Sequence, residues 1–384
     1  MAKNTYGNGS IYFSEQKNKW VGQIKVGIKA DGKINRRTVY GKTKKEVKEK
    51  IKRIQAEVIT GVYKQPSELT IPDLANSIND NKKALNQIGD TAYGRNKDTI
   101  KIISNDHIAS VPIQKINEVM LNQFLAKQVH YSNSVIKKIY AMCNRTFKKA
   151  ISMDIISKNP LDEIITPKST KMTKKIKALT IQQQKGFINA INEDNKEPYR
   201  TMLLLELFTG VRMGEICALS PHSIYFNYSL IEVTRTMTRD GEYKTTLNNK
   251  TKTYAGLRRI KVDKSVMGLL KDYIDNYFVT NEYDLIFTKN GNMISTNQVN
   301  SYYKRLIERY NIVDDVTKCN QHQLRHTYAT RSIESGMPAK VLQYRLGHSD
   351  ITITLNTYCD VFNEYEDTYI DKTQDYLTAQ GIAI

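Results

Sequence analysis

The chain has 384 residues, which is long enough for two or three domains that each bury a core. It carries 58 Lys and Arg against 39 Asp and Glu, a formal net charge of +19, which favours a polyanionic partner, nucleic acid before membrane. No apolar run approaches the roughly eighteen residues of a membrane span, and the N-terminus lacks a signal-peptide core, so we expect a cytoplasmic protein.

Cysteine spacing and loop motifs exclude further classes. The four cysteines are scattered without paired spacing, which is typical of reduced thiols and argues against a disulfide framework or a zinc site: Cys143, Cys217, Cys319 and Cys359. The chain has no Gly-rich phosphate loop and no Walker lysine motif, which argues against nucleotide-driven work.

Residues 1–64 are expected to form a small basic unit of three strands and one helix. The strands are predicted at Ser10–Phe13, Lys19–Val26 and Asn35–Tyr40. A capping box at Thr43–Glu46 then begins a helix, which we expect Gly61 to end. The apolar stripe of this helix is Val47, Ile51, Ile54 and Val58.

This N-terminal unit contains sixteen Lys and Arg against five Asp and Glu. A sheet that presents Lys25, Arg36 and Arg37 is suited to lying in a DNA groove. Clustered positive charge is the electrostatic footprint that DNA binding requires. The alternative is a basic, solvated surface over a very small core.

Residues 67–165 are expected to be all-helical. Thr70 is a plausible N-cap, with Pro72 close inside the start of the helix. Further helices are expected from near Thr91 and over Ile116–Val129, and the clearest one follows Ser132–Ser134. The basic residues on the outer faces of this last helix are candidate DNA contacts: Lys137, Lys138, Arg145 and Lys148. An isolated charge run is more often a solvated face.

Residues 166–177 hold five lysines and no acidic residue. That composition suits an extended linker along a phosphate backbone, with Lys171, Lys174 and Lys175 as candidate contacts. The alternative is a hinge that touches nothing in particular.

The remaining residues, 178–384, are expected to mix helices and strands. Thr180 is a candidate N-cap, a buried helix is expected at Tyr199–Phe208, and strands are expected at Leu230–Val233 and Arg258–Val262. Three further helices are predicted at Ser265–Tyr277, Thr296–Tyr310 and His322–Ser335. The fold class is therefore multidomain α+β: a small three-stranded sheet with a helix, an all-α unit and a mixed α+β unit.

Chemistry-bearing residues gather in two stretches of this last unit. In Thr209–Glu215, Gly210 stops the buried helix and Arg212 begins the next beside Glu215; alone, such a pair is most often a surface ion pair. The second stretch holds His322, Arg325, His326, Arg345-Leu-Gly-His348 and Tyr358. Arginine and histidine donate to phosphate oxygens, and a tyrosine hydroxyl can become a covalent nucleophile.

The histidines at positions 322 and 326 also have the spacing of zinc ligands on one helix face. A zinc-protease motif needs Glu where Gln323 stands, and no further Cys or carboxylate cluster completes a coordination shell. We therefore expect no metal.

His-x-Leu-Arg-His, Leu-Gly-His and the downstream Tyr resemble the second motif box of the tyrosine recombinases, the integrases of phages and conjugative transposons. Thr-Gly-Val-Arg-Met-Gly-Glu resembles their first box. The resemblance implies that Arg212, Arg325 and His348 stabilise a phosphate, that Tyr358 attacks it, and that His322 helps to accept or position the tyrosine proton. Glu215 would support Arg212, and His326 would be structural. By the family's register Lys252, in the hairpin before Arg258, is the general acid, with Lys250 as second choice.

The same resemblance implies a 3′-phosphotyrosyl intermediate, without metal, ATP or other cofactor. It implies an arm-type DNA-binding domain at 1–64, a core-binding domain at 67–165, a basic linker at 166–177 and a catalytic domain at 178–384. The partners would be double-stranded attachment-site DNA, three further copies in a homotetramer, an excisionase and a DNA-bending host factor. The acidic segment after Asp360 would dock on a neighbouring protomer, or be a solvated tail.

Two other functions stay open from the sequence. A type IB topoisomerase uses similar chemistry to relax supercoils alone. A DNA-binding regulator would keep the fold without the activity. The N-terminal basic unit and the acidic C-terminal segment favour recombination, the integration or excision of a mobile element.

Overall fold

The computed structural model describes residues 9–28, 32–60, 63–171, 176–242, 244–248 and 256–382. The chain divides into two compact units, residues 1–88 with 95–172 and residues 89–94 with 173–384, and each is described by itself. None of the helices in the described part of the chain combines the length and the hydropathy needed to cross a membrane.

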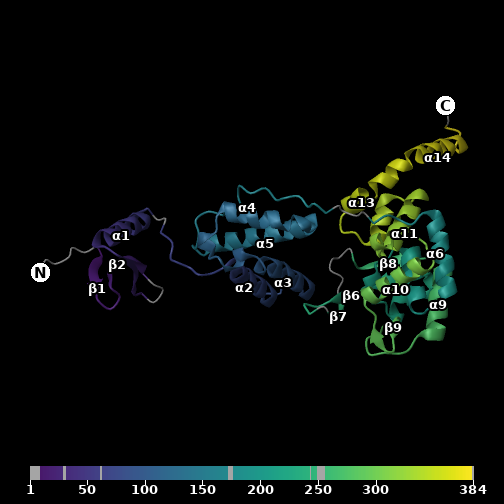
Figure 1. The fold of residues 1–384 in the computed structure, drawn as a ribbon. Coiled ribbons are helices and arrows are strands. Elements are labelled where there is room, and N and C mark those ends of the chain that lie inside the picture. The colour runs from purple at the N-terminus through teal and green to yellow at the C-terminus, as the bar shows by residue number, and fades with distance from the viewer. Residues whose placement is uncertain are drawn as a thin grey trace. The chain divides into compact units, whose positions relative to one another are not determined.

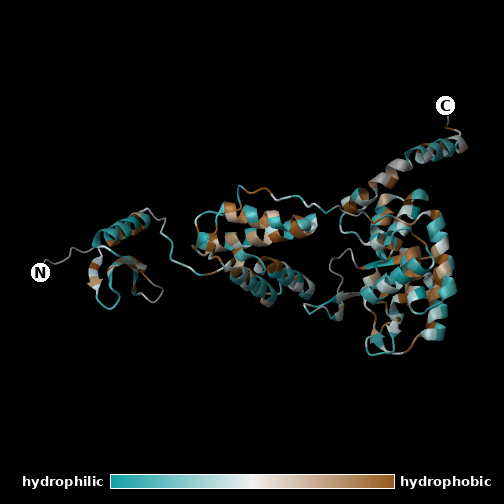
Figure 2. Cartoon of the chain, viewed as in Figure 1, coloured by the Kyte–Doolittle hydropathy of each residue, from teal (hydrophilic) through white to brown (hydrophobic). Residues whose placement is uncertain are grey.

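The N-terminal sheet is antiparallel, in the order β1 (Ser10–Ser14), β2 (Lys19–Ile28), β3 (Ile34–Gly41). Helix α1 (Lys44–Ile59) follows and packs against the sheet (Figure 1). Its N-cap Thr43 accepts the Glu46 amide at 3.2 Å, which confirms the predicted helix start. The stripe of α1 meets Ile24 of β2 in a small core, while the other faces of the helix are hydrophilic (Figure 2). The predicted end at Gly61 lies outside the described residues.

Four helices make up most of residues 70–152: α2 (Ile71–Ala84), α3 (Asp90–Ser104), α4 (Glu118–Lys127) and α5 (Asn133–Ser152). Thr70 is the N-cap of α2, as the sequence predicts, and it also forms a capping box with Asp73. Helix α5 buries Ile136, Ile139 and Phe147 in the shared core, because these residues recur at helical spacing. The core of these helices is separate from that of the N-terminal sheet.

The mixed C-terminal part begins with α6 (Ile181–Asp194), α7 (Tyr199–Thr209) and α8 (Met213–Ile216). A three-stranded antiparallel sheet follows in the order β4 (Ile224–Tyr225), β5 (Leu230–Val233), β8 (Arg258–Lys261), and β6 (Thr236–Arg239) pairs with β7 (Thr245–Asn248). After α9 (Lys264–Tyr277) and the β9–β10 hairpin (Thr288–Lys289, Asn292–Met293) come α10 (Thr296–Arg309) and α11 (His322–Glu334). These elements agree with the predicted helices and strands.

Helix α7 is the centre of this part, because α6, α9, α10 and α11 all pack on it. It is buried along almost its whole length, including the carboxylate of Glu206. Its end is set by Gly210, whose φ of +66° is the left-handed conformation that a helix-ending residue adopts most easily as glycine. The chain then turns directly into Arg212 at the start of α8.

Three more helices close the chain: α12 (Ala339–Leu346), α13 (Ile351–Glu364) and α14 (Glu366–Ala379). Side chains of α11, α12 and α13 share a small separate core that includes Ile333, Leu346 and Tyr358. Helix α14 buries none of its residues, and it carries most of the acidic side chains that follow Tyr358.

Candidate active site

Four of the predicted catalytic residues, from three parts of the chain, line one cavity of about 500 Å³. Arg212 comes from the start of α8, His322 and Arg325 from α11, and His348 from the turn between α12 and α13. The other lining residues are Glu215, Thr236, Gly256, Gly347, Ser349 and Ile353. The structure thus brings together side chains that lie more than a hundred positions apart in the sequence.

Arg212 is fixed at three points while its side chain stays 38% exposed to the cavity. Its amide and its Nη1 donate to Glu215, each at 3.1 Å, and its Nη2 donates to the Gly347 carbonyl at 2.9 Å. A planar guanidinium held in this way is preorganised, because it loses little freedom when it binds an anion.

Glu215 also binds a second arginine, Arg258 on β8. Arg258 Nη2 and Nη1 donate to the two Glu215 oxygens at 2.7 and 3.2 Å, and its Nε donates to the Arg345 carbonyl at 2.9 Å. Both side chains are buried, and Arg258 holds the pKa of Glu215 below its usual value against the opposing effect of burial. The ionised Glu215 therefore ties the start of α8 to β8.

Arg325 is almost fully buried beneath the cavity, 2% exposed. Its Nη1 donates to the Gly210 carbonyl at 2.6 Å, and its Nη2 donates to the Leu346 carbonyl at 2.7 Å. Burial, and then the nearby Arg212, lower the pKa of Arg325 to about 9, so it remains a cation at neutral pH. Three guanidinium groups surround one carboxylate here, which leaves an excess of positive charge at the cavity.

His348 is held by both of its ring nitrogens. Its Nε2 lies 3.0 Å from Arg325 Nη2, and its Nδ1 lies 2.8 Å from the Thr354 hydroxyl. Since a guanidinium only donates, Nε2 accepts and the ring proton sits on Nδ1. Burial and Arg325 lower the pKa of His348 to about 4, which keeps the ring neutral.

His322 stands one helical turn before His326, with the two rings perpendicular and 5.1 Å apart. Burial, and then Arg325, lower the pKa of His322 to about 3. A ring this hard to protonate is a hydrogen-bonding group rather than a strong base at neutral pH.

Tyr358 lies behind the cavity wall in α13, where it is 4% exposed and packs in the small core shared by α11, α12 and α13. Its hydroxyl lies 3.1 Å from His326 Nδ1. Burial raises the pKa of Tyr358 to about 12. The predicted nucleophile is therefore close to the cationic cluster, and the histidine beside it is the one that the sequence assigned a structural role.

The predicted general acid Lys252 and its alternative Lys250 lie outside the described residues. The structure does place the ends of their segment, because β7 ends at Asn248 and β8 starts at Arg258, whose side chain binds Glu215 of the cavity.

Comparison with known proteins adds an independent line. Residues 177–364 match the model of the phage integrase family. This segment belongs to the phage integrase family of tyrosine recombinases. The chain's relatives include a XerC-like tyrosine recombinase of Caldanaerobacter subterraneus subsp. tengcongensis, 24% identical over 92% of this chain and 95% of that protein. They also include the transposase of transposon Tn916 from Enterococcus faecalis, 24% identical over 81% of this chain and 79% of that protein.

The fold is also that of an integrase. The solved structure of the Tn1549 transposon integrase with a circular intermediate DNA superposes with a TM-score of 0.65, at 24% identity, over 76% of this chain and 95% of that one. The expected family and the expected fold class are therefore confirmed.

The candidate DNA contacts of this integrase family member are spread over the first unit and the linker. On the sheet, Lys25 and Arg36 are paired across β2 and β3 and exposed, whereas Arg37 is paired with the buried Ile24 and faces the helix side. The three do not share one face, because successive side chains of a strand alternate. Lys171 is exposed. Lys174 and Lys175 lie outside the described residues.

The four basic candidates on α5 do share an outer face. Lys137, Lys138, Arg145 and Lys148 are all exposed, and the apolar residues of the same helix are buried. The helix contains no acidic residue. Their contacts with DNA stay a prediction.

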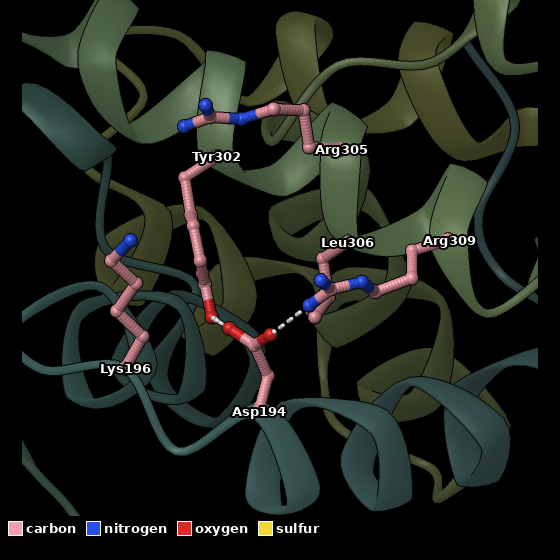
Figure 3. Close-up of a pocket in the computed structure, with 6 residues that line it drawn as sticks. All are labelled: Asp194, Lys196, Tyr302, Arg305, Leu306 and Arg309. Atoms are coloured by element: carbon pink, nitrogen blue, oxygen red, sulfur yellow. Dashed lines mark hydrogen bonds and ion pairs between the residues drawn. The ribbon is translucent and has the colours of Figure 1, made fainter.

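A second cavity, of about 250 Å³, lies between the end of α6 and α10 and shares no residue with the first (Figure 3). Tyr302 and Arg309 both donate to Asp194 there, at 2.6 and 2.8 Å. Lys196 and Arg305 complete a mainly cationic lining.

Among the residues that the structure describes, no group of three or more His, Cys, Asp or Glu could hold a metal ion.

The sequence did not predict the roles of two residues of the site, Arg258 and Thr354, or the contact of His326 with Tyr358. Arg258 was expected only as the start of a strand, and its place directly after the predicted hairpin of Lys252 was the one usable signal. The contact of Thr354 with His348 depends on the turn before α13, and the contact of His326 with Tyr358 depends on how α11 and α13 meet.

Proposed function

We propose that this protein is a site-specific DNA recombinase, an integrase that cuts and rejoins DNA through a 3′-phosphotyrosyl intermediate to move a mobile element. One observation carries the proposal: Arg212, Arg325, His322 and His348 line a single cavity, and the Tyr358 hydroxyl contacts His326, whose ring lies against that of His322. Membership of the phage integrase family supports the same reaction class. The named relatives and structural neighbours include proteins of transposons.

The cavity suits a phosphodiester in its transition state. Attack concentrates negative charge on the two non-bridging oxygens, and Arg212 and Arg325 would stabilise it with charge-assisted hydrogen bonds. His348 would add a donor from Nε2 once its proton moves from Nδ1 and Arg325 Nη2 turns from Nε2 to the phosphate, and the Thr354 hydroxyl can then donate to Nδ1 instead. His322 would complete the set as a neutral hydrogen-bonding ring. Because these groups are fixed before DNA arrives, little reorganisation opposes the reaction.

The remaining steps are attack and departure. Tyr358 Oη would attack phosphorus, and the bond to the 5′ oxygen would break. Lys252, or Lys250 as second choice, would protonate that oxygen as the general acid. The new phosphotyrosyl bond keeps the energy of the phosphodiester, so a 5′-hydroxyl from another strand can attack it and rejoin DNA without ATP.

The wider assembly follows from the chemistry. Exchange between two duplexes cuts four strands, and each cut needs one Tyr358, which supports a homotetramer on double-stranded DNA. The basic units at 1–64 and 67–165 would serve as arm-type and core-type DNA-binding domains joined to the catalytic part by the basic linker. We propose that an excisionase and a DNA-bending host factor set the direction, and that the protein acts in the cytoplasm.

The test is covalent capture. A labelled duplex that contains the element's junction, with a nick close to the cut site, loses its short 5′-hydroxyl fragment and traps the intermediate. The wild-type protein is expected to form a protein–DNA adduct, also in EDTA, and Tyr358→Phe to form none while still binding the duplex. An adduct from Tyr358→Phe, or none from the wild type, would overturn the proposal.

Two alternative functions give different products in one further assay. Two duplexes with different labels, each with a junction site, are expected to yield joint molecules. A type IB topoisomerase would relax a supercoiled plasmid and give no joint product. A DNA-binding regulator would shift the duplex in a gel and form neither adduct nor joint product.

A further inference from the structure

The Tyr358 hydroxyl meets a histidine that is distinct from the one the motif suggested. Its recorded partner is His326 Nδ1, at 3.1 Å, with the two rings 5.7 Å apart and tilted. His322 instead lines the cavity. The two histidines sit one turn apart on α11, so one faces the anion site and the other faces the nucleophile.

A phenol in this setting needs a proton acceptor. Burial raises the pKa of Tyr358 to about 12, so almost none of it is ionised at neutral pH. Burial and Arg325 lower the pKa of His326 below its usual value, which keeps the ring neutral, and Nδ1 accepts in the tautomer that carries its proton on Nε2. The pKa of His322 falls further, to about 3, which makes His322 the weaker base of the two.

We infer that His326 is a further catalytic residue, which holds the Tyr358 hydroxyl and takes its proton at Nδ1 as the oxygen attacks the phosphate. This inference rests on the proposed recombinase function and replaces His322 in that step. The O–H bond of Tyr358 breaks as the Oη–P bond forms, the P–O5′ bond breaks, and the departing oxygen receives a proton from the hairpin lysine. On rejoining, His326 returns its proton to Tyr358, and the lysine recovers its own from the attacking hydroxyl.

The backbone supports a short movement of the nucleophile. Tyr358 has φ −119° and ψ 18°, so the helical conformation of α13 is interrupted at this residue. Helix α13 packs on α11, which carries both histidines, and Arg325 lies near enough to Tyr358 to lower its pKa in part. His322, which lines the cavity, has its ring 5.1 Å from that of His326.

The surroundings make the proton on His326 transient. Arg325 and His322 on α11, His348 after α12 and Tyr358 on α13 are the titratable groups that face it. Arg325 disfavours a cationic His326, so protonated His326 readily gives its proton back. In return, the negative charge on the phosphate that arrives in the cavity offsets part of that repulsion.

The experiment compares three proteins in the nicked-duplex assay: wild type, His326→Asn and His326→Ala. The Asn oxygen stands close to the position of Nδ1 and accepts the same hydrogen bond, but it does not take a proton at neutral pH. We expect His326→Asn to bind DNA like the wild type and to form the adduct about 10²–10⁴-fold more slowly. The wild-type rate is expected to fall only at a pH below the usual histidine pKa of about 6.5, because the pKa of His326 is lowered, and this dependence is expected to be absent in His326→Asn.

A fluorinated tyrosine at position 358 provides the second measurement. Its more acidic hydroxyl needs less help from a base, so it is expected to restore part of the rate of His326→Asn while changing the wild-type rate little. A change in packing alone would not be rescued in this way. Three results would each overturn the inference. They are cleavage by His326→Asn at the wild-type rate, cleavage by His326→Ala that is faster than cleavage by His326→Asn, and no rescue of His326→Asn by the fluorinated tyrosine. If the wild type itself forms no adduct, the result overturns the proposed recombinase function, and the inference about His326 falls with it.

Discussion

Arg258 and Glu215 form a buried ion pair at the base of the active-site cavity, with Arg258 Nη2 donating to Glu215 Oε2 at 2.7 Å and the two side chains 0% and 5% exposed. The same carboxylate holds Arg212. Glu215 thus positions one arginine of the site and depends on the other for its own charge. Arg258 on β8 therefore acts on Arg212 through Glu215, although it does not contact Arg212 in the recorded hydrogen bonds.

Arg258→Met is expected to lower the free energy of unfolding by about 3 kcal/mol, because it leaves Glu215 buried with one partner fewer. Denaturant unfolding measures the change. Arg259 is the matched control, since it is the next residue of β8 and its side chain is 64% exposed where it pairs with Glu232. Arg259→Met is expected to leave stability unchanged within error. Equal losses for the two variants would contradict the assignment.

Gly347→Ala is expected to reduce both stability and adduct formation. Gly347 has a φ of +64°, and a Cβ there would lie 2.8 Å from Arg258 Nη1 and 3.0 Å from its Cζ, so Arg258 would have to shift away from Glu215. Gly291→Ala is the control, because Gly291 has a φ of +77° with nothing within 4 Å of an added Cβ. The control is expected to lose about 1 kcal/mol of stability from backbone strain and none of the activity.

The two arginines of the cavity are expected to differ when each is changed to lysine. Arg212→Lys removes the paired donors of a partly exposed side chain, so we expect adduct formation to fall about 10²–10³-fold with little loss of stability. Arg325→Lys also removes a donor to the buried carbonyls of Gly210 or Leu346, so it is expected to lose activity and about 1–3 kcal/mol of stability. Thermal unfolding and the nicked-duplex assay together separate the two effects. A stable Arg325→Lys protein would show that these carbonyl contacts matter little.

The hairpin lysines are distinguished by the leaving group. Lys252→Ala is expected to lose adduct formation on ordinary DNA and to recover it on a substrate with sulfur in place of the bridging 5′ oxygen, because a thiolate leaves without a proton donor. Lys250→Ala is expected to cleave both substrates at nearly the wild-type rate. The opposite pattern would assign the general acid to Lys250 instead.

Much of the fold could be predicted from the sequence, because its signals are local. Capping residues such as Thr43, Thr70 and Thr180 mark helix starts that the structure confirms. Gly210 marks the end of α7, because the helix ends in a left-handed backbone conformation that glycine adopts without strain. The family motifs also identify the site residues, because each motif is a short, continuous stretch of sequence.

What could not be predicted depends on contacts between distant segments. The partner of Tyr358 is set by the packing of α13 on α11, and the partner of His348 is set by the turn that brings Thr354 close. The separation of Arg37 from Arg36 follows from strand alternation, but only the register of β2 against β3 shows which of the two faces outward. Each of these is a tertiary fact that a motif cannot contain.

Glu206 gives a prediction about pH. It is fully buried in α7, and burial raises its pKa well above the usual value, so the folded protein keeps it protonated where the unfolded chain ionises it. Relative to Glu206→Gln, the wild type is therefore expected to lose stability as pH rises above about 4.5, by up to about 1.4 kcal/mol per pH unit, and to match the variant at lower pH. Denaturant unfolding of both proteins from pH 4.5 to pH 7 measures the difference.

Glu308→Gln, on the exposed side of α10, is the matched control for loss of one acidic side chain. A difference that stays constant or shrinks with rising pH would mean that Glu206 is ionised in the folded protein, paired with the Arg325 charge.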